Sequence, residues 1–177
     1  IARKSEAQFD IELNVISGGN SSSIYLIWKE GLPEGINNLR LGESFLLGND
    51  TAYGETVPGC VHDTMTLEAQ IIELKEKPSL PIGEVGVDAF GEKPYYEDRG
   101  MMKRAIIAVG KQDTDLGGMH PTDTQIEIMG GSSDHTILDV THADKRYKVG
   151  DVVSFTLEYG AMLKLATSPY VEKAYIK

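Results

Sequence analysis

A change in the sequence pattern near residues 54–60 constrains the fold of this 177-residue chain more than any other feature. Before it, short apolar segments alternate with turns rich in glycine, serine and asparagine, which is typical of α/β units. After it, segments rich in β-branched residues are separated by glycine-rich turns, at the spacing of an all-β module. We therefore expect two parts, residues 1–57 and residues 58–177.

In the first part, residues 13–17 predict a short strand, and Gly-Gly-Asn at residues 18–20 predicts the turn that ends it. The apolar residues 24–28 fit a helix or a strand, and residues 38–41 predict a second strand. Apolar segments and turns thus recur in the order expected of α/β units.

The second part opens with a long predicted strand at residues 66–76. Its apolar residues alternate with polar ones as far as Ile71, and the phase then slips at Ile72, which indicates a β-bulge. Further segments rich in β-branched residues predict additional strands at residues 103–109, 124–129, 136–141 and 152–159.

Composition and charge narrow the classes of function. The 17 Lys and Arg against 27 Asp and Glu give a formal net charge of −10, which argues against non-specific binding to nucleic acid or to an anionic membrane. No apolar run approaches the ~20 residues of a membrane-spanning helix. The single cysteine excludes an internal disulfide, so a cytoplasmic location is expected. Because the chain begins at Ile1 without Met, we expect a processed chain or part of a larger protein.

The richest local signal is Ser-Gly-Gly-Asn-Ser-Ser-Ser at residues 17–23. Its small residues leave backbone N–H groups and serine hydroxyls unencumbered at the end of a strand, an arrangement that can hold a phosphate. The motif lacks the lysine of a Walker A loop and the spaced glycines of a dinucleotide fingerprint. The alternative interpretation is a tight turn followed by an N-cap serine.

A second signal, Leu-Arg-Leu-Gly-Glu at residues 39–43, places Arg40 and Gly42 at the end of the next predicted strand. If that strand is buried, the guanidinium needs a partner, because an unpaired buried charge is costly. A structural salt bridge is the simplest interpretation. Two adjacent strand ends of this kind also resemble the phosphate site after strands seven and eight of a (β/α)8 barrel.

Three ordered motifs resemble the alanine racemase-like, fold-type III enzymes that depend on pyridoxal 5'-phosphate (PLP), and most closely the alanine/ornithine racemase group. They are residues 17–23, residues 36–43 (Ile-Asn-Asn-Leu-Arg-Leu-Gly-Glu) and residues 133–139 (Ser-Asp-His-Thr-Ile-Leu-Asp). The resemblance covers essentially the whole chain. It implies a mainly β chain with some α structure, made of the last strands of a PLP-binding (β/α)8 barrel at residues 1–57 and a C-terminal antiparallel β-domain of alanine racemase type at residues 58–177.

The resemblance also implies a set of cofactor contacts. Ser21 falls on the phosphate-binding serine, and Gly42 and Glu43 fall where backbone N–H groups face the same phosphate. Arg40 falls on the arginine that faces the pyridine nitrogen; because arginine keeps its proton, it can hydrogen-bond that nitrogen without protonating it. Three further residues are expected to contact the cofactor: Asn20, Ser22 and the C-terminal Tyr170.

Racemisation needs one acid/base group on each face of the substrate α-carbon. In the family one is the cofactor-binding lysine of the first barrel strand, which we expect to be absent here, so that this chain alone is inactive. The other is a tyrosine that follows a strand and a glycine; Lys111 takes its place, and a lysine partly removed from water can act as a base. An ordinary surface lysine is the alternative, and Tyr95 or Tyr96 can supply a phenol instead. Asp134 falls on the aspartate of a Met-Asp pair that the partner subunit places near the substrate carboxylate, with Ser133 replacing the Met.

Other polar residues give weaker signals. Asp113 and Asp115, together with Asp134, suggest a substrate with a distal ammonium group such as ornithine, but aspartates also commonly form turns. No metal ligand is expected, because the spacing of the histidines fits no metal-binding motif; this concerns His62, His120 and His135. Cys60 has no base beside it in the sequence and is expected to be inert.

The sequence therefore predicts the C-terminal part of a PLP-dependent amino-acid racemase that interconverts L- and D-amino acids by two-base proton transfer at Cα. Ornithine and alanine are the candidate substrates. The full protein is expected to be a head-to-tail homodimer with no nucleic-acid or membrane partner. The alternative is a non-catalytic, β-rich module that binds a ligand or a protein.

Overall fold

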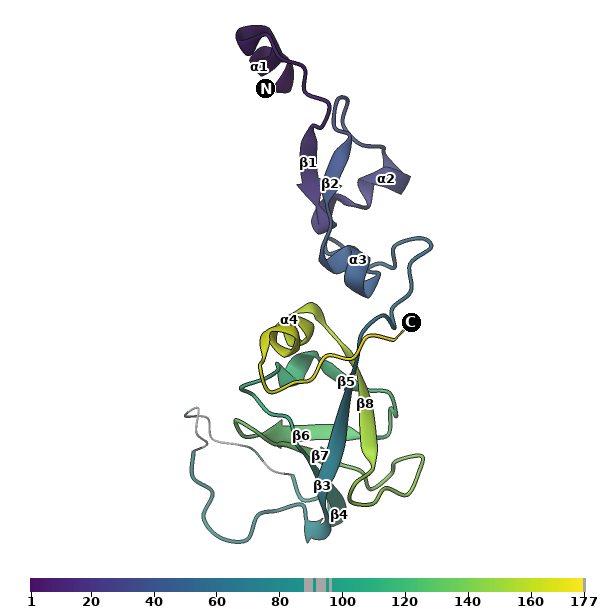
Figure 1. Ribbon diagram of the computed structural model, residues 1–177. Coiled ribbons are helices and arrows are strands. Elements are labelled where there is room, and N and C mark those ends of the chain that lie inside the picture. Colours follow the sequence, from purple (N-terminus) through teal and green to yellow (C-terminus); the bar gives the residue numbers. More distant parts are fainter. Residues whose placement is uncertain (88–90, 92–94, 96, 177) are drawn as a thin grey trace. The chain divides into compact units, whose positions relative to one another are not determined.

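The computed structural model describes residues 1–87, 91, 95 and 97–176 of the chain (Figure 1). The chain divides into two compact units, Ile1–Met65 and Thr66–Lys177. This division lies a little further along the chain than the boundary expected between residues 57 and 58. No helix in the described part of the chain is both long and apolar enough to cross a membrane.

The first unit has two strands that pair in parallel, with a short helix between them in the sequence (Figure 1). Ser17 lies opposite Asn38, and Asn20 lies opposite Arg40. Because parallel strands need a crossover connection, this is the α/β arrangement predicted for the first part of the chain. Its elements are α1 (Ala2–Phe9), β1 (Ser17–Asn20), a 3-10 helix (Ser21–Ser23), α2 (Leu26–Lys29), β2 (Asn38–Arg40) and α3 (Glu43–Leu47).

Strand β1 is made of the residues predicted to be a turn, and the predicted strand at residues 13–17 was wrong except at its last residue. The Asn37 side chain explains part of this shift, because it accepts the Ile16 N–H at 2.8 Å and donates to the Asn14 carbonyl at 2.8 Å. The Asn37 backbone N–H also donates to the Ile16 carbonyl at 3.1 Å, so the segment before β1 is held by one residue, through its side chain and its backbone, and not by a strand ladder. A Cβ on Gly18 would lie 2.5 Å from Ile36 Cδ1, so a larger residue there would force the Ile36 side chain to move.

The second unit is a six-stranded antiparallel sheet with the strand order β5-β8-β3-β4-β7-β6. Helix α4 contacts a 3-10 helix that precedes β5 (Figure 1). The elements are β3 (Thr66–Pro78), β4 (Met101–Ile107), the 3-10 helix (Leu116–Gly118), β5 (Met119–Pro121), β6 (Glu127–Gly131), β7 (Thr136–Asp139), β8 (Val152–Leu157) and α4 (Tyr159–Thr167).

The predicted bulge in the long strand is confirmed. In β3, Ile71 pairs with Ile107 and Glu73 pairs with Ile106, so Ile72 is the extra residue. Before the bulge the apolar residues alternate inward, and their burial builds the centre of the sheet. The side chains of the core come from all parts of the sheet and from α4, and include Leu67, Ala69, Ile71, Ala105, Ile107, Leu138, Val153, Phe155, Ala161 and Leu165.

The end of the second unit differs from the expected strand at residues 152–159. Strand β8 ends at Leu157, and α4 begins at Tyr159. Ala161, Met162 and Leu165 are buried, which is the i, i+1, i+4 pattern of one helix face. Gly118 permits the close approach of this helix, because a Cβ there would lie 3.2 Å from the Ala161 Cβ.

Candidate functional site

In the first unit, β1 and β2 are followed by two loops that carry most of the residues expected to contact a cofactor. Because the strands are parallel, their carboxyl ends lie at the same edge of the pair. Ser21 and Ser22 follow β1 directly, and Gly42 and Glu43 follow β2 after one intervening residue. The structure therefore brings the two predicted phosphate-binding segments together.

Ser21 is the residue on which these two loops converge. Its hydroxyl oxygen accepts the N–H of Gly42 at 3.2 Å and the N–H of Ser44 at 3.3 Å. The Ser44 hydroxyl in turn donates to the Ser21 carbonyl at 3.2 Å, and Ser44 is fully buried. These contacts fix the distance between two segments about twenty residues apart in the sequence.

Asn20 organises the beginning of the 3-10 helix. Its side-chain oxygen accepts both the backbone N–H of Ser22, at 3.0 Å, and the Ser22 hydroxyl, at 2.6 Å. This is an N-cap interaction, which the sequence analysis had assigned to a serine in its alternative interpretation. The cap and the convergence on Ser21 are present together, so the local turn does not exclude a binding role.

Arg40 is exposed, and its Nη1 donates to the Ser17 hydroxyl at 2.8 Å across the strand pair. The interpretation of Arg40 as half of a buried salt bridge is therefore wrong. Glu43, the first residue of α3, is half-buried, and burial raises the pKa of its carboxyl group.

The residues at this edge fit a phosphate group. They are small, they carry hydroxyls that can donate a hydrogen bond, and the first N–H groups of a helix have no partner within that helix. A Cβ at Gly42 would meet nothing within 4 Å, so there is open space beside this backbone. The Ser21 hydroxyl and the Glu43 N–H can donate to a phosphate directly. The Ser22 hydroxyl and the Gly42 N–H, which donate here to Asn20 and Ser21, would exchange those partners for it.

In the second unit, the two residues expected to act on the substrate lie on adjacent loops. The backbone N–H of Lys111 donates to the Ser132 carbonyl at 2.9 Å, and that of Gln112 donates to the Ser133 carbonyl at 2.9 Å. A Cβ on Gly110 would lie 2.4 Å from the Ser133 carbonyl oxygen and 2.5 Å from the Asp134 nitrogen. Glycine at residue 110 therefore allows the Lys111 turn to pack directly against the loop that carries Asp134.

Asp134 itself is exposed and lies at the tip of the loop between β6 and β7. The Ser133 hydroxyl donates to its carboxylate, and His135 Nδ1 lies 3.9 Å from its Oδ2. The residue that replaces the family's methionine thus contacts the aspartate directly.

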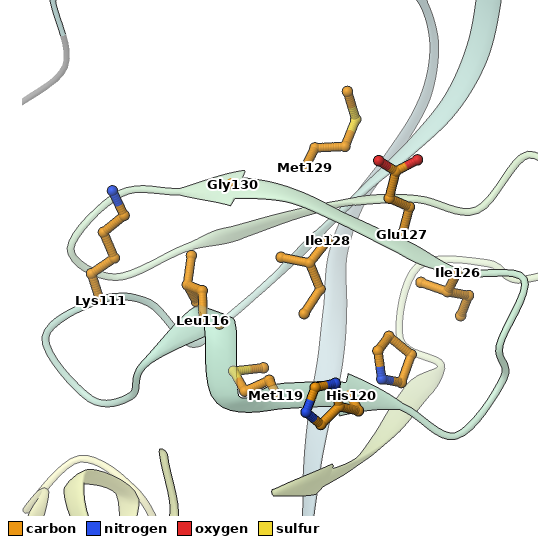
Figure 2. Close-up of a pocket in the computed structure, with 11 residues that line it drawn as sticks. Lys111, Leu116, Met119, His120, Ile126, Glu127, Ile128, Met129 and Gly130 are labelled. Carbon is orange, nitrogen blue, oxygen red and sulfur yellow. The ribbon is translucent and has the colours of Figure 1, made fainter. Parts of the chain in front are cut away.

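Lys111 stands at one end of a hollow of about 500 Å³ (Figure 2). The hollow lies between β5 and β6, the two edge strands of the sheet, so the sheet curls nearly into a closed barrel. Figure 2 shows Leu116, Met119 and Ile128 pointing into it, whereas Glu127 lies on the other side of β6. The lining next to Lys111 is therefore mainly apolar.

Tyr170 lies after α4 and is 79% exposed. It lines a smaller hollow of about 250 Å³ together with Asp113 and Ser168. Asp113 is buried and accepts the Ser168 hydroxyl at 2.6 Å, and Asp115 caps the 3-10 helix by accepting the Gly117 N–H at 3.3 Å. Both aspartates thus accept structural hydrogen bonds, Asp115 within its own turn and Asp113 from a distant serine, which argues against direct binding of a substrate ammonium group.

Two tyrosines were the alternative phenol donors. Tyr95 is 91% exposed, and Tyr96 lies outside the described residues. Among the residues that the structure describes, no group of three or more His, Cys, Asp and Glu side chains could hold a metal ion.

Sequence reasoning missed three residues that organise these sites: Ser44, Gly110 and Ser168. Ser44 and Ser168 are buried serines, and nothing in their local sequence distinguishes them from exposed ones. Gly110 has a weak signal, because a glycine that ends a β-branched run often marks a close backbone approach.

Comparison with known proteins identifies relatives along nearly the whole chain. The chain is 60% identical over 173 residues to the ornithine racemase of Acetoanaerobium sticklandii, covering 98% of this chain and 49% of that protein. It is 44% identical over 175 residues to the lysine racemase of Thermotoga maritima, covering 99% of this chain and 49% of that protein. The chain thus spans about half the length of the curated relatives it matches. No protein-family model matches the sequence.

Solved structures share the fold at lower identity. Alanine racemase from Acinetobacter baumannii matches with a TM-score of 0.50 and 22% identity, over 96% of this chain and 45% of that one. Alanine racemase from Bartonella henselae, solved with covalently bound pyridoxal phosphate, matches with a TM-score of 0.53 and 21% identity, over 93% of this chain and 45% of that one. The resemblance expected from the sequence is confirmed: the chain is related to ornithine and lysine racemases along nearly its whole length and has the fold of the corresponding part of alanine racemases.

Proposed function

We propose that this chain is the C-terminal part of a PLP-dependent amino-acid racemase that interconverts L- and D-amino acids. The observation that carries the proposal is the convergence of two strand-end loops on Ser21, where Gly42 and Ser44 donate to its hydroxyl. This convergence joins the two segments in which the family holds the cofactor phosphate. The 60% identity to an ornithine racemase makes a racemase the natural context for such a site.

The cofactor would be held mainly by the first unit. The Ser21 hydroxyl and the Glu43 N–H would donate to its phosphate. The Ser22 hydroxyl and the Gly42 N–H would join them by giving up their present acceptors, Asn20 and Ser21. Arg40 would hydrogen-bond the pyridine nitrogen, because its guanidinium is exposed and anchored at one end by Ser17. When bound, PLP supplies an electron sink that makes the Cα proton of an amino acid easier to remove. Two further contacts are proposed for Asn20 and Tyr170.

Lys111 would hold or accept the proton at one face of the substrate α-carbon. Hydrogen bonds from its own backbone N–H and from that of Gln112 fix the Lys111 backbone, and the mainly apolar hollow lies beside it. Asp134, on the adjacent loop, would lie near the substrate carboxylate. Its neighbours Ser133 and His135 would help to orient that carboxylate. The proton on the opposite face would be handled by a lysine elsewhere in the full protein.

The organisation of the whole protein follows from the same reasoning. Residues 1–57 would complete a (β/α)8 barrel, and residues 58–177 would form the β-domain. The substrate would be a free amino acid, with ornithine favoured over alanine because the two curated relatives act on amino acids with a basic side chain, as their names state. The full protein would be a cytoplasmic, head-to-tail homodimer in which the β-domain of one subunit covers the barrel of the other.

The fold alone does not decide the reaction. D-threonine aldolase from Filomicrobium marinum also shares it, with a TM-score of 0.51 and 15% identity over 87% of this chain and 36% of that one. The experiment must therefore test cofactor and reaction separately. A non-catalytic ligand- or protein-binding module remains the alternative outcome, and the apolar hollow between β5 and β6 would be its binding site.

The test uses the full-length parent protein. We expect an absorbance band near ~420 nm that borohydride reduction abolishes, because PLP bound to an enzyme lysine absorbs there. Loss of optical rotation of L-ornithine, with L-lysine and L-alanine in parallel, then measures racemisation. A protein without the band after PLP addition would favour the binding module, and a band without racemisation of any amino acid would point to another PLP reaction.

A further inference from the structure

The turn that carries Lys111 is held from two directions in the second unit. On one side, the N–H groups of Lys111 and Gln112 donate to carbonyls of the loop between β6 and β7. The turn itself is closed by the N–H groups of Asp113 and Thr114, which donate to the Gly110 carbonyl at 2.9 and 3.1 Å. Lys111 therefore lies inside a closed backbone turn, and its position depends on what anchors that turn.

On the other side, the anchor is the buried carboxylate of Asp113. It accepts the Ser168 hydroxyl at 2.6 Å, across 55 residues of sequence, and both residues are more than nine-tenths buried. Ser168 is the C-cap of α4 and is itself tied down, because its hydroxyl accepts the Tyr170 N–H at 3.1 Å and its carbonyl accepts the Lys173 ammonium. The Lys111 turn is thus linked to the end of α4 by one short side-chain hydrogen bond.

This arrangement differs from that of the other turn aspartates in the same unit. Asp98, Asp115 and Asp139 each accept the backbone N–H two residues further on, which is the common turn-forming interaction. Asp113 instead contacts a distant side chain from a buried position. Burying a carboxylate is costly unless it is hydrogen-bonded, so a residue that served only to form the turn would be expected at the surface.

We propose that Asp113 is a positioning residue: through its hydrogen bond to Ser168, it holds the Lys111 turn at the place where the lysine can exchange a proton with the substrate α-carbon. The inference rests on the proposed role of Lys111. Proton transfer is sensitive to small displacements, and a shift of about 1 Å can lower a rate by about 100-fold. Loss of the Asp113–Ser168 contact would therefore impair one face of the reaction without removing any group that touches substrate or cofactor.

The test measures exchange of the Cα hydrogen for deuterium in the full-length, PLP-loaded protein, starting separately from the L- and the D-enantiomer of the racemised amino acid. A defect confined to Lys111 slows exchange from one enantiomer, because the opposite face is served by a different group. A general loss of folding or of cofactor slows both equally. We expect Lys111→Ala to abolish exchange from one enantiomer only.

For Ser168→Ala and Asp113→Ala, we expect exchange from that same enantiomer to fall about tenfold or more, while exchange from the other stays within about twofold. Ser168→Thr and Asp113→Asn, which keep a hydroxyl donor and an oxygen acceptor, should restore most of the rate. The matched control is Thr167→Val, since the Thr167 hydroxyl makes its hydrogen bonds within α4, to the Leu163 and Lys164 carbonyls at 3.0 and 3.1 Å.

Two outcomes would overturn the inference in distinguishable ways. If Ser168→Ala and Asp113→Ala slow Cα exchange equally from both enantiomers, the contact only stabilises the fold. If they leave both exchange rates unchanged, the contact is dispensable. Full exchange from both enantiomers in Lys111→Ala would remove the proposed role of Lys111, and the positioning role of Asp113 with it. The PLP absorbance band is recorded for each variant, so that exchange rates are compared only between proteins that carry the cofactor.

Discussion

The two units of this chain differ in how many apolar side chains they bury. Among the described residues, the second unit buries sixteen hydrophobic side chains, whereas the first buries three: Ile24, Leu47 and Val57. In the first unit the buried polar groups are Ser21, Ser44 and Asp50, and Asp50 accepts the N–H groups of Ala52 and Tyr53 at 2.9 and 2.7 Å. The second unit thus has an extensive apolar core, whereas the first buries as many polar side chains as apolar ones.

The first unit leaves many of its large hydrophobic side chains exposed. Its helix α1 buries no residue, and large hydrophobic side chains remain exposed, among them Phe9, Ile11, Val15, Ile27, Phe45, Tyr53 and Val61. Single exposed apolar residues are normal on a protein surface. A unit of 65 residues that exposes this many and buries only three is unusual. The pattern supports the proposal that these residues pack against the rest of a barrel in the full protein.

The largest expected effect contrasts two phenylalanines. Phe155, in β8, is fully buried, so Phe155→Ala should lower the free energy of unfolding of the second unit by about 3–5 kcal/mol. Phe45, in α3, is 75% exposed, so Phe45→Ala should change stability by about 0.5 kcal/mol or less. Urea unfolding of this chain measures both, with far-UV circular dichroism for the sheet and fluorescence of Trp28 for the first unit.

If Phe45→Ala lowered the free energy of unfolding as much as Phe155→Ala, the first unit would have an apolar core of its own, and the contrast between the units would be wrong. The same two variants test the contrast further in the full-length protein. There, if the remainder of a barrel covers Phe45, we expect Phe45→Ala to become destabilising, while the effect of Phe155→Ala stays the same.

The next effect tests close backbone packing in the second unit. Gly110→Ala would place a Cβ 2.4 Å from the Ser133 carbonyl oxygen, and because backbone cannot rotate away, we expect a loss of about 1–3 kcal/mol. Gly86→Ala is the control, because a Cβ there meets nothing within 4 Å. Thermal unfolding of the two variants side by side measures the difference; similar melting temperatures would mean that the two loops do not pack as closely as described.

A smaller effect tests the hydrogen bonds of the first unit. Ser21→Ala removes the acceptor for the N–H groups of Gly42 and Ser44, and we expect a loss of about 1 kcal/mol. In the full-length protein it should also weaken retention of PLP on dialysis. Ser23→Ala, in the same 3-10 helix, is the control. If the two variants lose cofactor at the same rate, Ser21 is not a phosphate ligand.

The smallest effect concerns an ion pair on β3. Lys75 and Lys77 contact the Glu73 carboxylate at 2.7 and 2.8 Å, and these hydrogen bonds lower the pKa of Glu73 from its ordinary value of 4.5 to about 2. The pairing therefore stabilises the fold above pH 4.5, and this contribution is lost as the pH falls towards 2. Because such exposed pairs contribute little, Glu73→Gln should be only slightly less stable at pH 7. Urea unfolding at a series of pH values should show the difference in free energy of unfolding between the wild type and Glu73→Gln shrinking below pH 4.5. A difference that does not change with pH would contradict the ion pair.

Several features of the fold were predictable because they arise within a few residues. The alternation and phase slip around Ile72 predicted both the long strand and its bulge, since a side-chain period of two is a local property of extended backbone. The small residues at 17–23 predicted a polar site at a strand end. The turn predicted at residues 18–20 was wrong, because glycine favours turns locally and the strand there depends on pairing with β2, about twenty residues away.

The sequence by itself determined the alternation of strands, the bulge and the chemistry available at residues 17–23 and 40–43. Only the tertiary structure decided which distant groups meet: the convergence of Gly42 and Ser44 on Ser21, the packing of Gly110 against the Asp134 loop, and the contact of Asp113 with Ser168. The reason is physical. Local patterns follow from side-chain volume and backbone preference, whereas contacts between distant residues depend on strand register and on burial shared by the whole sheet, which no short segment encodes.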